Sequence, residues 1–175
     1  EVVARVTESI ERPRIALLNI GEEDIKGNDR VRDAAARLAA SELNYVGFVE
    51  GDSIQDHRAD VVVCDGFSGN VALKSMEGTA KLIGYFLERE FRRSAYGQLA
   101  GLVAWPVLRS LKRRLDPRRY NGASLVGLDG IVIKSHGGAD ELAFQQALGT
   151  AVVEAQKRVP AQIRSLVAEQ VRAEA

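Results

Sequence analysis

Short apolar runs alternate with helical patterns through the first half of the chain. Arg14–Ile20 and Val61–Cys64 are predicted to be buried strands, with Tyr45–Val49 as a further strand. Asp29–Ala40 carries apolar residues at helical spacing, and Asp52–His57 is expected to form a short helix. Strands that alternate with helices indicate βαβ units, so the pattern predicts an α/β fold with a largely parallel sheet.

Helical spacing dominates residues 1–11 and most of the chain after residue 70. Four helices and one late strand are predicted there: helices Glu1–Glu11, Val71–Arg93, Glu141–Arg158 and Ala161–Ala173, and strand Gly130–Lys134. Prolines separate several of these elements, since the residue before a proline disfavours helical geometry. A length of 175 residues suits one core, so residues 1–175 are predicted to form a single α/β domain.

The stretch from Ala59 to Met76 combines a strand, a turn and a helix. Asp65–Asn70 contains two glycines, which permit a tight turn with positive φ before the helix expected from Val71. A helix N-terminus at a strand's carboxyl end offers unpaired N–H groups and a positive dipole end, which suit an anion such as phosphate. Lys74 adds a positive charge about one turn further on. The other interpretation of this stretch is an ordinary strand-to-helix turn.

Polar residues gather where the predicted strands end. Asn19, Glu22, Glu50, Asp65 and Asn70 all fall at such ends, where ligands of parallel sheets bind. The small-residue loop 135–140 takes the corresponding place after the last strand. These residues therefore form the first candidate site.

Composition excludes several kinds of chemistry. Acidic and basic residues balance at 24 each, which gives no indication of nucleic-acid binding. Two histidines and one cysteine offer no zinc spacing, and no dinucleotide or nucleotide phosphate loop occurs, so no metal or cofactor is predicted. Cys64 fits a small buried hydrophobe better than a nucleophile. Phosphate or acyl-phosphate chemistry remains, carried by backbone N–H groups, by the amides Asn19, Asn70 and Asn121, and by Lys74 and Lys134. His136 is either an acid–base group or a loop residue bonded to the backbone.

The segment Leu99–Leu108 is the most apolar in the chain, and it contains the single tryptophan, Trp105. It is too short to span a bilayer. Six basic residues follow it: Arg109, Lys112, Arg113, Arg114, Arg118 and Arg119. An apolar segment beside cations favours contact with an anionic membrane surface, and the alternative is contact with a second subunit.

Five motifs together resemble one family. They are L-L-N-I-G-E-E (17–23), I-K-G-N (25–28), V-V-C-D-G-F-S-G-N-V-A-L-K (62–74), N-G-A-S-L-V-G-L-D-G (121–130) and K-S-H-G (134–137). In order and spacing, from about Arg12 to Leu148, they resemble the phosphate acyltransferase (PlsX) family of bacterial phospholipid synthesis. The resemblance covers the C-terminal half of such proteins. It implies a three-layer α/β/α fold of the isocitrate/isopropylmalate dehydrogenase-like type.

The resemblance also implies a reaction. Inorganic phosphate attacks the thioester of a long-chain acyl–acyl carrier protein, and a membrane-bound glycerol-3-phosphate acyltransferase consumes the acyl phosphate. The phosphate-binding residues expected on this basis are Gly66, Ser68, Gly69, Asn70 and Lys74. The expected catalytic residues are His136, Asn19 and Lys134, with Asp65 and Glu22 ordering the site.

Family members are peripheral membrane homodimers on the cytoplasmic side, with a protruding helical hairpin that corresponds to residues 71–119. The membrane-contact residues expected on this basis are Leu99, Leu102, Val103, Trp105, Leu108, Arg109, Lys112 and Arg113. Two other functions stay open: a non-catalytic membrane- or partner-binding module, and a phosphotransacetylase-like enzyme acting on short acyl-CoA. Whether a chain of this length is active by itself also stays open.

Overall fold

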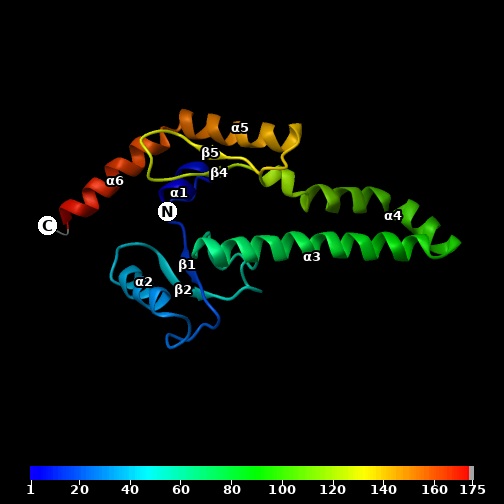
Figure 1. Ribbon diagram of the computed structural model, residues 1–175, viewed down its shortest axis with the longest axis horizontal. Coiled ribbons are helices and arrows are strands. Elements are labelled where there is room, and N and C mark those ends of the chain that lie inside the picture. Colours follow the sequence, from blue (N-terminus) through cyan, green and yellow to red (C-terminus); the bar gives the residue numbers. More distant parts are fainter. Residues whose placement is uncertain (174–175) are drawn as a thin grey trace.

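The computed structural model describes residues 1–173, and the predicted domain of residues 1–175 extends two residues beyond them. Figure 1 shows the order of the elements: α1 (Val2–Thr7), β1 (Ile15–Leu18), α2 (Asp29–Ala39), β2 (Tyr45–Val49), β3 (Val61–Val63), α3 (Gly66–Arg92), α4 (Ala95–Arg114), the 3-10 helix η1 (Pro117–Tyr120), β4 (Ala123–Ser124), β5 (Ile133–Lys134), α5 (Glu141–Gln156) and α6 (Val159–Ala173).

A three-stranded parallel sheet with the order β2-β1-β3 confirms the predicted α/β class. The central strand β1 is the most buried, with Ile15, Ala16 and Leu17 packed beside Val49 of β2. Strands β4 and β5 form a separate antiparallel pair. The apolar runs therefore identified the strands that pair in parallel, and the central strand β1 supplies most of the buried side chains of this sheet.

Arg14 and Asp60 join the starts of β1 and β3. The carboxylate of Asp60 accepts from Nε and Nη2 of Arg14 at 3.0 and 2.9 Å and from its backbone N–H at 2.8 Å. The hydrogen bonds from the Arg14 side chain lower the pKa of Asp60 to about 2. This clamp sets the register in which β3 enters the sheet.

We expect Asp60→Asn to lower the free energy of unfolding near neutral pH. In acid, we expect this difference from the parent protein to disappear. A carboxyl group whose folded pKa lies below its ordinary value stabilises the fold above that ordinary value, and the contribution is lost as pH falls toward the folded pKa. The difference in stability between the two proteins should therefore shrink as the pH falls from about 4 to about 2. Urea midpoints of both proteins should converge across it. A constant difference between the two midpoints would assign the effect to packing.

A second cluster surrounds α5, which contacts η1 and β5, while α1 packs against α6. Ala143, Ala147 and Val159 are its buried apolar residues. Nζ of Lys157 donates to the carbonyls of Val6 and Thr7 at 2.6 and 3.2 Å, so it caps the C-terminal end of α1. This contact holds α1 against the junction of α5 and α6.

Helices α3 and α4 run side by side away from the sheet and form a hairpin (Figure 1). The chain reverses at Arg93 and Ser94, where the Ser94 hydroxyl accepts from the N–H of Gly97 and caps α4. A Cβ at Gly101 would lie 3.2 Å from the ring of Phe91, so the lack of a side chain lets the two helices approach closely. Among residues 1–173, no helix is long and apolar enough to cross a membrane.

Several predicted boundaries were wrong. Helix α3 starts at Gly66 instead of Val71, and its glycines adopt helical φ instead of positive φ, because Asp65 caps the helix directly after β3. Asp52–His57 forms turns instead of a helix, and the strand Gly130–Lys134 shortens to two paired residues. The predicted helix Glu1–Glu11 ends at Thr7, because Ser9 adopts a positive φ. Local apolar spacing therefore did not predict where these elements begin and end, because strand pairing and helix caps set their ends.

The prediction that β3 and Cys64 are buried was also wrong. Cys64 is exposed, and Val63 at the end of β3 is 43% exposed. Strand β3 is an edge of the three-stranded sheet, so it pairs on one side only.

The protein exposes far more surface than its mass requires. Its accessible surface is 13061 Å², whereas a compact protein of 19.0 kDa exposes about 8,400 Å². Large apolar side chains on several helices, including Leu82 and Ile83 of α3 and Phe144 of α5, contribute to this surface. Such faces are typical of a polypeptide that is buried against further protein.

Candidate functional site

Lys74 and His136 lie next to each other although 62 residues separate them in sequence. Lys74 projects from the third turn of α3, and Nζ lies 3.2 Å from Nε2 of His136 in the loop after β5. Glu77, one turn further along α3, accepts from Nζ of Lys74 at 2.9 Å. This hydrogen bond lowers the pKa of Glu77 and keeps the carboxylate ionised. The fold thus brings together two of the predicted site residues.

The surroundings of the His136 ring contain more donors than acceptors. The ammonium of Lys74 can only donate, and a neutral imidazole has one N–H and one acceptor nitrogen. Nε2 faces Lys74, and Nδ1 faces the backbone N–H of Gly138 at 3.2 Å. In either tautomer one ring nitrogen therefore carries its proton toward another donor. An anionic oxygen placed between these groups would accept from them and remove the conflict.

The start of α3 is occupied by its own capping residue. Oδ1 of Asp65 accepts from the N–H groups of Phe67 and Ser68 at 2.9 Å each, and Oδ2 accepts from the Ser68 hydroxyl at 2.6 Å. The Ser68 hydroxyl hydrogen bond is the main cause of the lowered pKa of Asp65. An anion at this end of the helix would therefore compete with a carboxylate for the same donors.

The other residues of the predicted phosphate turn lie in the first turns of α3. Gly66 and Asn70 are exposed there. A Cβ at Gly69 would lie 2.9 Å from Sγ of Cys64, so this glycine allows the end of β3 to approach the helix. The site role predicted for these three residues stays a prediction, and Gly69 also has a packing role.

Asn19 and Glu22 hold the loop after β1. Asn19 is buried, and its side chain accepts from the N–H of Ile20 at 2.9 Å and donates to the Lys26 carbonyl at 3.3 Å. Glu22 forms an ion pair with Arg58 and lines a cavity of about 420 Å³ between α2 and β2. Within residues 1–173, none of these hydrogen bonds or ion pairs reaches Lys74 or His136.

Lys134, the third predicted catalytic residue, is exposed on β5, where it pairs with Ala123 of β4. It stands two residues before His136 on the same strand-and-loop segment. Among the described residues, the hydrogen bonds of Lys74 go to Glu77 and His136 and not to Lys134, so the catalytic role of Lys134 stays a prediction.

Glu77 was not predicted at the site, and Asn121 was predicted only as one of several amides that could hold an anion. Glu77 lies one turn from Lys74 on the same helix, and this i, i+3 spacing of opposite charges was a readable signal. Asn121 follows η1, and its Oδ1 accepts from the backbone N–H of His136 at 2.9 Å. Nothing in the local sequence links Asn121 to His136, because the contact depends on how the hairpin returns to the sheet.

The residues predicted to contact a membrane lie on α4, beyond the reversal at Arg93 and Ser94. Leu102, Val103 and Trp105 are 72%, 75% and 59% exposed, and Leu99 is exposed beside them. Leu108 is only half-buried, and it lies on the α4 face that carries Gly101 and packs on α3. The three basic residues predicted to contact the membrane follow toward the base of the hairpin, and all are exposed: Arg109, Lys112 and Arg113. The apolar segment thus borders the turn of the hairpin without forming it.

Sequence comparisons agree with the resemblance. The family described as fatty acid synthesis protein matches residues 2–162. The phosphate acyltransferase of Alkalilimnicola ehrlichii is 61% identical over 162 residues, which are 93% of this chain and 47% of that protein. The phosphate acyltransferases of Halorhodospira halophila and Nitrosococcus oceani are 58% and 54% identical over 91% and 93% of this chain, and over 47% and 48% of their own lengths.

The chain therefore spans about half the length of the curated relatives it matches. The family match nevertheless includes every element from α1 to the start of α6, together with Lys74 and His136. Because the match extends over residues 2–162, this chain belongs to the fatty acid synthesis protein family.

Proposed function

We propose that this chain provides part of the active site of a phosphate acyltransferase, which moves a long-chain acyl group from acyl carrier protein to inorganic phosphate. The observation that carries the proposal is the excess of donors around the His136 ring, contributed by Lys74 and Gly138. A phosphate oxygen is the acceptor that this cluster lacks. The name phosphate acyltransferase carried by the relatives supports the same chemistry.

The reaction needs no nucleophile from the protein. A phosphate oxygen forms a bond to the thioester carbonyl carbon, the carbon–sulfur bond breaks, and the departing thiolate takes up a proton. Lys74 holds the phosphate, and His136 supplies that proton or stabilises the thiolate. Asn19 and Lys134 support the carbonyl oxygen as it gains charge, while Asp65 and Glu22 order the neighbouring loops. Gly66, Ser68, Gly69 and Asn70 form the wall of the phosphate site at the start of α3.

The complete enzyme requires more polypeptide than this chain. The excess of exposed surface, 13061 Å² against about 8,400 Å² for a compact protein of the same mass, supports burial against further protein. We attribute that role to the remaining half of the length found in the relatives and to a second subunit. Together they extend the sheet into a three-layer α/β/α architecture of the isocitrate/isopropylmalate dehydrogenase-like type, as a homodimer.

The hairpin places the enzyme on the cytoplasmic face of the membrane. Leu99, Leu102 and Val103 recur at helical spacing on the exposed side of α4, with Arg109 and Arg113 further along the helix. An acyl phosphate is lipophilic, so release beside the bilayer shortens its path to a membrane-bound glycerol-3-phosphate acyltransferase.

We expect Trp105→Ala to weaken binding to anionic phospholipid vesicles about tenfold, because a large aromatic side chain no longer enters the interface. Co-sedimentation with vesicles of phosphatidylglycerol and phosphatidylethanolamine measures the effect. Phe144→Ala is the matched control, since Phe144 is similarly exposed but lies on α5, outside the apolar segment Leu99–Leu108. Equal effects of the two substitutions would point to general hydrophobicity and against a docking helix.

The test of the proposed function is acyl phosphate formation from palmitoyl–acyl carrier protein and inorganic phosphate. The chain is assayed as it stands and in a form extended to the length of its relatives. Turnover by the extended form alone would mean that the two halves share the site. Turnover with short acyl-CoA only would favour a phosphotransacetylase. Failure of both forms with every acyl donor would leave a non-catalytic binding module.

A further inference from the structure

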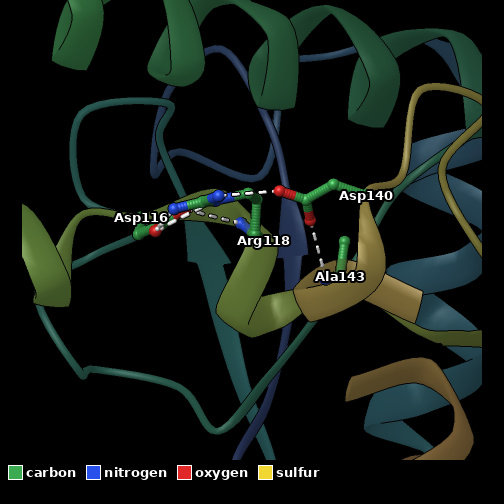
Figure 2. Close-up of polar contacts among 4 residues, drawn as sticks. All are labelled: Asp116, Arg118, Asp140 and Ala143. Carbon is green, nitrogen blue, oxygen red and sulfur yellow. Dashed lines mark hydrogen bonds and ion pairs between the residues drawn. The ribbon is translucent and has the colours of Figure 1, made fainter. Parts of the chain in front are cut away.

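The exit of the hairpin is fixed to the start of α5 by one arginine. Nη1 of Arg118 in η1 donates to Oδ2 of Asp140 at 2.7 Å, and its Nε and Nη2 donate to Asp116 at 2.6 to 3.1 Å (Figure 2). Asp140 also caps α5, since Oδ1 accepts from the N–H of Ala143 at 3.0 Å. These contacts lower the pKa values of Asp116 and Asp140, so both carboxylates stay ionised. Residues 116–121 therefore have a defined place beside the loop that carries His136.

Asn121 comes directly after η1 and forms hydrogen bonds through both ends of its amide group. Oδ1 accepts from the backbone N–H of His136 at 2.9 Å. Nδ2 donates to the Ser135 hydroxyl and to the Ala143 carbonyl, each at 2.8 Å. Both N–H donors and one of the two lone pairs of Oδ1 are thus used, and because donors and acceptor face different partners, the orientation of the side chain is fixed.

The loop that Asn121 holds has little packing of its own. A Cβ at Gly137 would meet nothing within 4 Å, and one at Gly138 would meet only the His136 ring, at 3.8 Å. His136 itself is exposed. Without side chains packed around the loop, hydrogen bonds set the position of its backbone. The bonds from Ala139 to the His136 carbonyl and from Gly138 to its ring lie within the loop, whereas the bond from the His136 N–H to Asn121 joins its backbone to another segment.

We propose that Asn121 is a positioning residue for His136, which rests on the proposed function of His136 and Lys74. By holding the His136 backbone, Asn121 keeps Nε2 within 3.2 Å of Nζ of Lys74, so both groups converge on one substrate oxygen. Both legs of the hairpin then meet at the site: α3 brings Lys74, and the exit after α4 brings Asn121. Misplacement of a reacting group by about 1 Å can lower a rate by about a hundredfold.

The test is a double-mutant cycle on acyl phosphate formation, measured in the chain extended to the length of its relatives. Asn121→Ala is expected to lower kcat about 10- to 100-fold with little change in KM for acyl carrier protein. In a His136→Ala background the same substitution should have almost no further effect. Asn121→Asp keeps the acceptor for the His136 N–H but turns its second oxygen toward the Ala143 carbonyl, so it should recover only part of the loss. Ser135→Ala removes only one of the other partners and serves as the matched control.

A purely structural asparagine gives a different result. Asn121→Ala would then cost the same factor with and without His136, and that additivity would overturn the proposal. Amide hydrogen exchange supplies a readout that needs no activity. The His136 N–H should be protected in the parent protein and in Asn121→Asp, and exchange about tenfold faster in Asn121→Ala. Fast exchange in the parent overturns the positioning role. Absence of turnover with a protected His136 N–H would instead count against the proposed function alone.

Discussion

Gly122→Ala is expected to destabilise the protein by about 2–5 kcal/mol, because it combines backbone strain with overlap of buried atoms. Gly122 has a φ of +116°, in a region that residues with a Cβ rarely adopt. A Cβ there would lie 2.9 Å from Cα of Ala147 and 3.0 Å from Oγ1 of Thr150. Both atoms belong to α5, so relief requires the helix to move. Urea unfolding followed by circular dichroism measures the loss.

Gly84→Ala is the matched control for that substitution. Gly84 lies within α3 with helical φ, and a Cβ there meets no atom within 4 Å. Alanine favours helix over glycine by about 1 kcal/mol, so this variant should be as stable as the parent or more stable. If both variants lost the same stability, the close approach of α5 to Gly122 would not be the cause.

Lys74→Ala is expected to raise the KM for phosphate about 10- to 100-fold in the chain extended to the length of its relatives. A hydrogen bond to a charged group contributes about 1.5–3 kcal/mol, which corresponds to that range. The substitution also leaves the Glu77 carboxylate without its cationic partner, which adds repulsion toward an anion. Initial rates at varied phosphate concentration measure the change.

Lys81→Ala provides the comparison for Lys74. Lys81 is an exposed lysine of the same helix, about 10 Å further along its axis, so the change in net charge is identical. We expect a change in KM below about twofold, since exposed charges at such distances are largely screened. An unaltered KM in Lys74→Ala, or equal changes in both variants, would remove Lys74 from the phosphate site.

Much of the fold could be predicted from apolar spacing alone. The parallel strands β1, β2 and β3 and the helices α2 and α3 all follow patterns that neighbouring residues create, whereas the second helix of the hairpin was expected only from the family resemblance. The ends of elements were less predictable. Asp65 starts α3 five residues early because a capping carboxylate outweighs the glycines that indicated a turn. This error mattered for the site, since the same carboxylate takes the N–H groups that had been assigned to phosphate.

The candidate site, like the fold, was predicted only in part. Lys74 and His136 were identified from the sequence as possible participants, from their residue types and their motifs. The proximity of Lys74 to His136 and the link from His136 to Asn121 were not predicted, because these contacts join residues that are 62 and 15 positions apart.

The sequence by itself determined the family, the parallel strands and the amphipathic segments, because these depend on residue type and on neighbours within a turn or a strand. The tertiary structure alone decided which polar groups meet. Asn19 turned inward to hold its own loop, whereas Asn121 reached across to His136. Chain reversal at Arg93 and Ser94 carries α4 back along α3 toward the sheet. Contacts of this kind depend on how whole helices pack, and local sequence carries little information about that packing.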